Sequence, residues 1–363
     1  MTVRRIGFLL PHFRAGGAER VVLNWIGALD RSRFAPVLFL TKREGAFLDL
    51  LPADVMPVSL GGGRALRLGR RIAEALAAEE IDIAYSATNA MNLALLTARG
   101  VRAARIVSEH TPPAAYLAEA KLAGLRRMAM RRYYPRADAI AVPTDGIAGE
   151  LAATLGRALP TVTLANPILD EGMTLPVRPP HRVPRIAAAG RLVTAKGFDL
   201  LIDACAMLAA RGVAFHLTMY GEGPLDADLR ARIGAARLDA HVTLAGHADP
   251  LIAALATADL FVLSSRREGF GNVVIEAMAA GTPVLATRSG GPQAIIEEGR
   301  NGFLVDAGDA AKLADAMARL IADPMRVRVV EAAKDTARRY GITASTRGFE
   351  ALLDEIGVRS IAA

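Results

Sequence analysis

Two kinds of hydrophobic pattern alternate along this chain. Short, mainly apolar runs such as Arg5 to Leu10 and Leu260 to Ser264 have the composition of buried strands. Longer segments such as Leu66 to Glu79 and Phe198 to Ala210 carry apolar residues at helical spacing. Because strands that alternate with helices form parallel sheets with helices on both faces, the pattern predicts an α/β fold.

The alternation stops once and then restarts, which predicts two domains. A chain of 363 residues also exceeds what one hydrophobic core usually organises. We expect a first domain over residues 1–170, a proline-rich linker over 171–184 and a second domain over 185–340. The strands expected in the first domain are Arg5–Leu10, Ala35–Thr41, Val55–Leu60, Ile81–Ser86, Arg105–Ser108, Ala139–Val142 and Thr161–Ala165. Those expected in the second are Ile186–Ala189, Phe215–Tyr220, Val242–Ala245, Leu260–Ser264 and Pro283–Thr287.

The cysteine count and the hydrophobic runs limit where the protein works. The single cysteine, Cys205, lies inside an apolar helical run, so we expect a buried thiol, and a disulfide within the chain is excluded. A reducing cytoplasm fits this composition. The first apolar run ends at Leu10, which favours a first strand over a signal peptide, and no run has the length of a membrane span.

The most informative stretch runs from Glu268 to Gly281 and reads EGFGNVVIEAMAAG. It follows a predicted strand and ends at a glycine that terminates helices well, so it predicts a strand, a glycine loop and a helix. With Asn272 as the expected N-cap, the first N–H groups of this helix can bind an anion such as phosphate. Glu276, one turn further in, is placed to accept hydrogen bonds from ribose hydroxyls. The alternative is an ordinary turn whose glutamate stabilises the helix dipole.

A second glycine loop, Gly190 to Gly197, follows the first strand of the second half and reads GRLVTAKG. Its two cations, Arg191 and Lys196, can neutralise the negative charge of a departing diphosphate. They can also be ordinary solvated cations. A third turn, Gly221 to Pro224, is weaker evidence, because glycine turns are more often turns than sites.

Glu268 and Glu276, together with the Gly-Arg-Leu and Lys-Gly pairs of the second loop, resemble the signature motifs of retaining glycosyltransferases of family 4, which have the GT-B fold. The resemblance covers nearly the whole chain and is strongest from Gly190 to Thr287. It implies two Rossmann-like, doubly wound domains that face each other across a cleft. It also implies that the helical segment over residues 341–363 crosses back to the first domain.

The resemblance implies an enzyme that transfers a sugar, with retention, from a nucleotide sugar to a hydroxyl acceptor. A UDP-sugar is the expected donor, GDP-mannose is an alternative, and no metal or other cofactor is expected. The implied catalytic residues are His110, Arg191, Lys196 and Glu268. The implied donor-binding residues are Gly16, Gly17, Arg191, Lys196, Glu268, Gly269, Phe270, Gly271, Asn272, Val273 and Glu276.

In the first half, Gly16 and Gly17 open the first helix after the first strand and resemble the glycine-rich loop of the family, whose backbone approaches the donor phosphate or the acceptor. His110 lies at the end of a predicted strand, where a sheet of this kind faces its ligands. The family has a histidine near this point that contacts the transferred sugar. His12 is the competing candidate for this role.

Other interpretations remain open. Asp226 and Asp228 imitate an Asp-x-Asp metal motif, but residues two apart on a helix point in different directions, so we do not expect a metal there. A GT-B sugar-nucleotide epimerase would carry many of the same motifs. A catalytically silent nucleotide-sugar binding module would not need Arg191, Lys196, Glu268 and Glu276 together.

The charge distribution suggests where the enzyme works. Residues 1–170 carry 22 Lys and Arg against 15 Asp and Glu, whereas the rest of the chain carries 22 against 22. This half shows no nucleic-acid-binding pattern. The excess gathers on two predicted helices, with Arg64, Arg67, Arg70 and Arg71 on one and Lys121, Arg126, Arg127, Arg131, Arg132 and Arg136 on the other.

The second basic helix also carries Leu122, Leu125, Met128, Met130, Tyr133 and Tyr134. Apolar and basic residues on one helix suit an anionic membrane surface, although a solvated basic face gives a similar pattern. Many bacterial members of the resembled family build lipid-linked glycans or lipopolysaccharide. We therefore expect a cytoplasmic protein, peripheral on the cytoplasmic face of the inner membrane, with a lipid-linked saccharide as acceptor.

Overall fold

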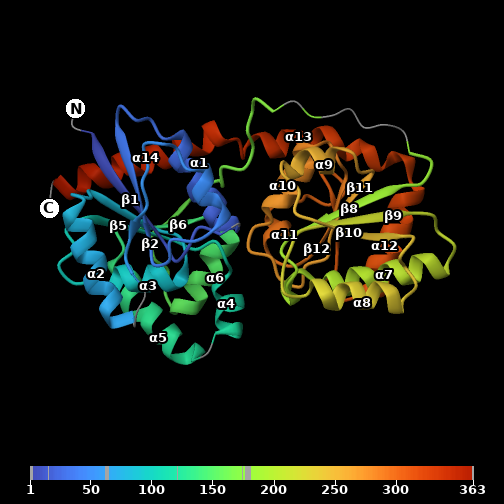
Figure 1. The fold of residues 1–363 in the computed structure, drawn as a ribbon, viewed down its shortest axis with the longest axis horizontal. Helices are drawn as coiled ribbons and strands as arrows, with labels where there is room; N and C mark the ends of the chain where they lie inside the picture. Colours follow the sequence, from blue (N-terminus) through green and yellow to red (C-terminus); the bar gives the residue numbers. More distant parts are fainter. Residues whose placement is uncertain are drawn as a thin grey trace. The chain divides into compact units, whose positions relative to one another are not determined.

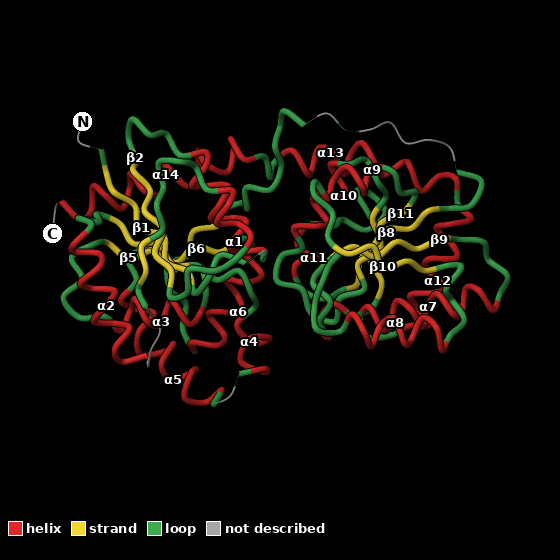
Figure 2. Tube along the Cα trace, in the orientation of Figure 1, coloured by secondary structure: helices red, strands yellow, loops and turns green. Residues whose placement is uncertain are grey.

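The computed structural model describes residues 3–14, 16–61, 65–120, 122–173, 175 and 181–361. They form two compact units, each with a central sheet surrounded by helices (Figures 1 and 2). Unit 1 comprises Met1–Ile168 together with Gly341–Ala363, and unit 2 comprises Leu169–Tyr340. The end of the chain therefore belongs to the same unit as its beginning.

The described residues of unit 1 form a seven-stranded parallel sheet with the order β3-β2-β1-β4-β5-β6-β7. Its strands are β1 Arg4–Leu10, β2 Phe34–Leu40, β3 Val58–Ser59, β4 Ile83–Ser86, β5 Ala104–Ser108, β6 Ala139–Val142 and β7 Thr161–Thr163. Its helices are α1 Gly17–Ala28, α2 Ala65–Ala78, α3 Asn89–Thr97, α4 Pro113–Glu119, α5 Ala123–Tyr133, α6 Asp145–Leu155 and α14 Ile342–Ile361, with short 3-10 turns η1 Ala46–Leu50 and η2 Tyr134–Arg136.

The last helix, α14, is built into the core of unit 1. Phe349 of α14 stacks on Trp25 of α1 with ring centroids 4.3 Å apart, and Tyr85 of β4 packs edge-on against Phe349 at 5.4 Å. Trp25 also donates a hydrogen bond from Nε1 to Ser345 Oγ (3.2 Å). Because large aromatic side chains dominate core energetics, these contacts fix α14 on this unit.

Unit 2 has a six-stranded parallel sheet with the order β10-β9-β8-β11-β12-β13 in its described part. The strands are β8 Arg185–Ala189, β9 His216–Tyr220, β10 Val242–Gly246, β11 Leu260–Leu263, β12 Val284–Thr287 and β13 Phe303–Val305. The helices are α7 Phe198–Ala210, α8 Asp226–Ala235, α9 Leu251–Ala256, α10 Asn272–Ala279, α11 Gly291–Ile295, α12 Ala310–Ala322 and α13 Val330–Arg338, with 3-10 turns η3 Thr194–Lys196 and η4 Pro324–Val329. Helices α7, α8 and α12 cover one face of the sheet, and α9, α10 and α13 lie on the other (Figure 1).

Both sheets are doubly wound, which confirms the predicted fold class of two Rossmann-like domains. In each sheet the strand order reverses at one point, between β1 and β4 in unit 1 and between β8 and β11 in unit 2. Ligands of open α/β sheets bind beyond the carboxyl ends of the strands at such a point. The loops that follow β8 and β11 are those with the two glycine motifs of the second half.

Several element boundaries differ from the sequence prediction. The expected strand Val55–Leu60 is reduced to Val58–Ser59. Val55 is buried, but it belongs to the loop before this strand and not to the sheet. Strand β13 was missed, since three residues are too few to show a pattern. None of the helices in the described part of the chain is both long and apolar enough to cross a membrane.

The prediction for the second basic helix, α5, also needs a correction. Met130 and Tyr134 are fully buried, so these two residues face the core and not a surface. The exposed apolar side chains are those of Leu122, Leu125 and Met128. The helix ends at Tyr133, which leaves Arg136 on the turn η2, and the predicted cations Arg64 and Lys121 lie outside the described residues.

Candidate functional site

Two loops of unit 2 pack backbone against backbone at the point where the strand order reverses. Gly197 has a φ of 65°, and a Cβ there would lie 2.2 Å from the carbonyl oxygen of Ser264. The N–H of Arg266 donates to the carbonyl of Ala195 (2.8 Å), which joins the loop after β11 to the loop after β8. Glycine at 197 is therefore required for the close approach that brings the two motifs together.

This packing brings Lys196 and Glu268 into direct contact. Lys196 Nζ donates to Glu268 Oε2 at 2.5 Å, and Ser265 Oγ donates to the same oxygen at 3.1 Å. The side chains are only 22% and 11% exposed, so the pair is partly shielded from water. Two of the predicted site residues, 72 positions apart in sequence, are thus in direct contact.

Arg191, the other predicted cation, lies on the same loop and is exposed. No hydrogen bond or ion pair of its side chain to another described residue is present, so its guanidinium is available to a ligand. The neighbouring Arg266, which sequence analysis did not single out, binds both carboxylate oxygens of Asp199 at 2.6 and 2.7 Å. This bond lowers the pKa of Asp199 and fixes the start of α7 to the Glu268 loop.

A third loop, which follows β12, supports the Glu268 loop. Glu268 donates its N–H to the carbonyl of Ser289 (2.8 Å), and Gly291 donates its N–H to the carbonyl of Glu268 (2.9 Å). A Cβ on Gly291 would lie 2.3 Å from the carbonyl oxygen of Phe270. Sequence analysis missed this loop, although its Gly290-Gly291 pair after a strand was an available signal.

The helix that follows, α10, presents an uncapped amino terminus. The N-cap is Gly271, with a φ of 96°, and not Asn272 as predicted, because Asn272 is already the first helical residue. Gly271 has no side chain that could accept from the first N–H groups, and one of these, the N–H of Val274, donates to the Gly271 carbonyl (2.8 Å). The start of a helix favours a bound anion through its dipole and its N–H groups. Asn272 and Glu276, four apart, are the partly exposed residues of the first turns, whereas Val273 is buried.

Two more predicted residues are placed so that only their backbone is available. Phe270 is 4% exposed, and its ring packs against Tyr340 with centroids 5.3 Å apart. Val273 belongs to the buried side of α10. Gly269, between Glu268 and Phe270, is partly exposed.

Taken by itself, this part of unit 2 combines an uncapped helix terminus and a free guanidinium with a Lys–Glu pair and a second carboxylate. The helix terminus, the Arg191 guanidinium and the Lys196 ammonium attract concentrated negative charge such as that of a diphosphate. The carboxylates accept hydrogen bonds from hydroxyl groups. Asp226 of the rejected metal motif bonds to Arg230 within α8 (2.7 Å) and lies outside these loops.

In unit 1, His110 follows β5, and its imidazole contacts two hydroxyl groups. Its Nε2 lies 3.0 Å from Ser108 Oγ and 3.4 Å from the Tyr85 hydroxyl, whereas Nδ1 is buried with no hydrogen-bond partner among the described residues. Burial lowers the pKa of His110 to about 4, so the imidazole is neutral at pH 7. A neutral imidazole can accept a hydrogen bond from a hydroxyl group.

The residue before it, Glu109, is a buried carboxyl that sequence analysis did not identify. Its Oε1 accepts hydrogen bonds from Asn89 and Asn92 of α3, both at 3.1 Å, and from Tyr134. Burial raises the pKa of Glu109, and the three hydrogen bonds act in the opposite direction. The network fixes the backbone next to His110 to α3 and to the turn after α5.

The competing histidine, His12, lies at the other side of the unit 1 switch point, after β1. Its Nδ1 is 3.4 Å from Glu19 Oε1. The Glu19 carboxylate turns back over Gly16, because a Cβ on Gly16 would lie 2.3 Å from Glu19 Oε2. The glycine is needed to admit this carboxylate at the start of α1, and Gly17, the first residue of the helix, is exposed.

Comparison with protein families gives two matches that together span most of the chain. The family described as "Glycosyltransferase Family 4" matches residues 15–171, and the family described as "Glycosyl transferases group 1" matches residues 183–323. A lipopolysaccharide core biosynthesis glycosyltransferase, LpsE of Rhizobium meliloti, is 36% identical over 210 residues, which are 56% of this chain and 60% of that protein. The chain spans about half the length of the curated relatives that it matches.

Solved structures show the same fold over almost the whole chain. The Anabaena protein HepE, crystallised in complex with UDP and glucose, superposes with a TM-score of 0.82 and covers 97% of this chain and 100% of its own at 21% identity. Sucrose-phosphate synthase from Thermosynechococcus elongatus superposes with a TM-score of 0.84 over 98% of this chain and 100% of its own at 20% identity. At these identities, the likeness concerns the fold alone.

Proposed function

Because the chain belongs to the family 4 glycosyltransferases of the GT-B fold, we propose that it transfers a sugar from a nucleotide sugar to a hydroxyl acceptor with retention of the anomeric configuration. The observation that carries this proposal is the Lys196–Glu268 pair beside the uncapped start of α10. One set of loops thereby offers groups for a diphosphate and groups for sugar hydroxyls. A glycosyl transfer needs both.

In this proposal, the donor diphosphate lies against the N–H groups of α10 and is neutralised by Arg191 and Lys196. Lys196 then exchanges its contact with Glu268 for one with phosphate, which frees the Glu268 carboxylate for sugar hydroxyls. Fixed cations and helix N–H groups can stabilise the leaving diphosphate, so the reaction needs no metal. The proposed donor is a UDP-sugar, in line with the UDP and glucose bound in the HepE crystal.

Glu276 binds the ribose in this proposal, since it shares the partly exposed face of α10 with Asn272. His110 of unit 1 assists at the reacting sugar, because its neutral imidazole can accept a hydrogen bond from a hydroxyl. No described carboxylate other than Glu268 belongs to the three loops as a candidate nucleophile. The proposed chemistry is therefore displacement on one face of the sugar, in which the leaving phosphate helps to deprotonate the acceptor.

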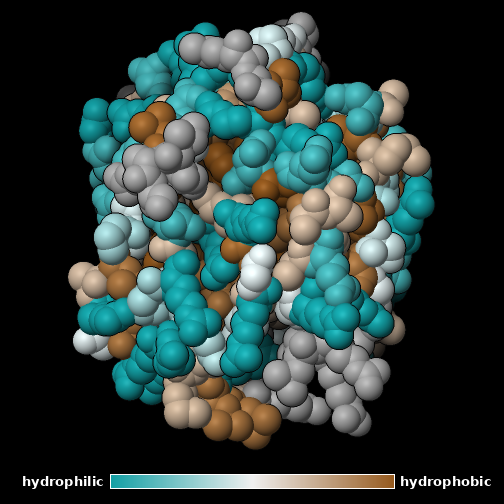
Figure 3. All heavy atoms as spheres, turned by 90° about the vertical axis from the view of Figure 1, so that its left-hand side faces the viewer, coloured by the Kyte–Doolittle hydropathy of each residue, from teal (hydrophilic) through white to brown (hydrophobic). Residues whose placement is uncertain are grey.

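The proposed acceptor is a lipid-linked saccharide, reached from the cytoplasmic face of a membrane. The support is the surface of α5 and its N-cap, where Leu122, Leu125 and Met128 are 71%, 56% and 61% exposed. Arg127, Arg131 and Arg132 of the same helix are exposed as well. The unit 1 side of the molecule is largely hydrophilic, and hydrophobic side chains gather at its lower edge, the level at which α5 lies (Figures 1 and 3). Such a surface can insert apolar side chains between anionic head groups.

A thermal-shift screen of nucleotide sugars tests the donor. A donor at a hundredfold its Kd stabilises the folded state by about 2.7 kcal/mol, whereas nucleotide sugars that do not bind leave Tm unchanged. The Arg191→Ala/Lys196→Ala double variant is the control and should lose the shift. The absence of any shift with UDP-sugars and GDP-mannose would contradict the proposed donor class.

A further inference from the structure

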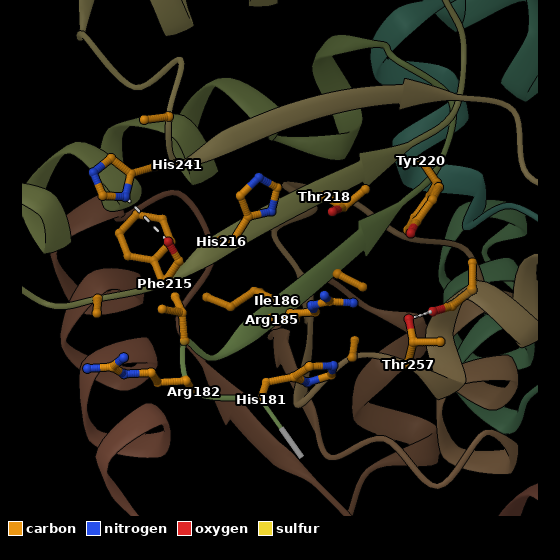
Figure 4. A pocket seen from close by; sticks show the side chains of 16 residues that line it. His181, Arg182, Arg185, Ile186, Phe215, His216, Thr218, Tyr220, His241 and Thr257 are labelled. Carbon is orange, nitrogen blue, oxygen red and sulfur yellow. Dashed lines mark hydrogen bonds between the residues drawn. The ribbon is translucent and has the colours of Figure 1, made fainter. Parts of the chain in front are cut away.

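Unit 2 contains a cavity that the proposed reaction does not use. It encloses about 890 Å³ and is lined by residues of the segment before β8, of β8 and β9, and of the end of α9 (Figure 4). None of its lining residues belongs to the loops that hold Arg191, Lys196 and Glu268. Its volume is within the range of small-molecule sites in proteins.

The cavity exists because one face of the sheet is left uncovered at β9. In β9, His216, Thr218 and Tyr220 are partly exposed, whereas Leu217 and Met219 are buried. Strands of parallel sheets are usually buried on both faces, so this alternation marks an open face. Helix α9 has only six residues, and its end, at Ala254 and Thr257, forms one wall of the cavity.

The lining is basic and contains no carboxylate among the described residues. Two arginines and three histidines contribute to it: His181, Arg182, Arg185, His216 and His241. The Arg185 guanidinium lies in the middle of the cavity, between His181 on one side and His216 and Tyr220 on the other (Figure 4). Burial raises the pKa of Tyr220, whereas its hydrogen bond with Thr218 and the charge of Arg185 act in the opposite direction.

His181 is fixed at the wall by a carboxylate behind it. Its Nδ1 donates to Asp259 Oδ2 at 3.0 Å, and the same oxygen accepts the backbone N–H of Arg185 at 2.9 Å. Its side chain is 7% exposed, and its Nε2 is buried with no partner among the described residues. A buried polar atom without a partner is costly, so a ligand group that bonds to it is favoured.

Aromatic rings provide the rest of the surface. Phe215 and His241 stack with centroids 5.1 Å apart, and the Tyr220 ring stands at the opposite end of the cavity (Figure 4). Arginine binds phosphate through paired N–H donors, and flat rings pack against the organic part of a small molecule. We propose that this cavity is a binding site for an organic phosphate, separate from the donor site.

Titration with phenyl phosphate, followed by calorimetry at low salt, tests this proposal on three variants of the full chain. Arg185→Glu reverses the central charge at an exposed position, Arg191→Ala/Lys196→Ala disables the donor loops, and Arg319→Ala removes an exposed arginine of α12 as a matched control. Circular dichroism melting verifies that each variant is folded. His216→Gln provides a second, milder change in the cavity wall, should Arg185→Glu fail to fold.

The proposal predicts that Arg319→Ala binds phenyl phosphate as wild type does, and that Arg191→Ala/Lys196→Ala keeps the binding that Arg185→Glu loses. Arg185→Glu should bind it at least about tenfold more weakly, because a charge-assisted hydrogen bond is replaced by repulsion. The proposal is overturned if wild type does not bind the probe, if Arg185→Glu or its substitute binds as wild type does, or if only the donor-loop variant loses binding. The comparison of wild type with Arg185→Glu does not involve UDP. Its result is therefore independent of whether the proposed transfer reaction is correct.

Discussion

In the proposed donor site, the carboxylate of Glu276 is the group assigned to the ribose. It shares the partly exposed face of α10 with Asn272, while the neighbouring positions of the helix are buried. Lys196 and Glu268 form a pair, so a change in either also alters the surroundings of the other. Substitution of Glu276 tests the ribose assignment at the scale of one residue.

Glu276→Ala should weaken the binding of UDP by roughly ten- to a hundredfold, since the loss of a partner in charged hydrogen bonds costs about 1.5 to 3 kcal/mol. Calorimetric titration measures the effect. Glu331→Ala, on the exposed surface of α13, is the matched control and should leave the affinity unchanged. An unaltered Kd for UDP in Glu276→Ala would remove the ribose assignment.

The protonation of His110 makes the stability of unit 1 depend on pH. Its pKa falls from 6.5 to about 4 on burial, so between these values the unfolded chain binds a proton that the folded chain does not. The stabilising effect of the neutral imidazole is therefore complete above pH 6.5 and is lost as the pH falls towards 4. The raised pKa of Glu109 changes stability with pH in the opposite direction. Wild type and a variant at position 110 both contain Glu109, so its effect cancels when the two are compared.

Between pH 7 and pH 5, wild type should lose at most about 2 kcal/mol more stability than His110→Gln. Urea unfolding of both proteins at the two pH values provides the comparison. Identical pH dependence in the two proteins would mean that His110 is not held neutral by burial.

At the scale of elements, the site in unit 2 depends on three loops that lock together. The loop after β8 contacts the loop after β11 at Gly197, and the loop after β12 contacts it at Gly291. The absence of a side chain at each glycine permits backbone contact. A methyl group at either position must displace the loop that holds Glu268.

Gly291→Ala should lower stability by about 1 to 3 kcal/mol, the usual cost of overpacking, and should also weaken UDP binding. The reason is that the added Cβ would lie 2.3 Å from the Phe270 carbonyl oxygen. Gly234→Ala in α8 is the control, because a Cβ there meets nothing within 4 Å and alanine favours a helix. Equal Tm values for the two variants would show that the loop after β12 does not support the site.

Helix α5 leads to a prediction about membranes. Binding to liposomes should require anionic lipid and should weaken steeply with ionic strength, since each basic residue near the surface contributes about 1 kcal/mol and is screened by salt. The triple change Arg127→Ala, Arg131→Ala and Arg132→Ala should reduce sedimentation with these liposomes. Equal recovery with neutral and anionic liposomes at low salt would favour a soluble acceptor.

At the scale of the whole molecule, periodicity was enough to predict two doubly wound domains, because each buried strand and each amphipathic helix leaves a local pattern. Features that depend on contacts between distant residues were not predictable. The pairing of Lys196 with Glu268 joins separate loops, and the burial of Met130 and Tyr134 follows from packing and from the polar network around Glu109. The N-cap at Gly271 was misassigned, because an αL glycine can precede a helix without any capping side chain.

The central claim is that the chain transfers a sugar with retention and without a metal. The most direct measurement is a proton NMR time course of the first sugar product formed from the donor identified by the thermal-shift screen, in the presence of EDTA. We expect the first product to have the anomeric configuration of the donor and the rate to match that without chelator. A product of inverted configuration, or activity that EDTA abolishes and magnesium or manganese restores, would contradict the claim.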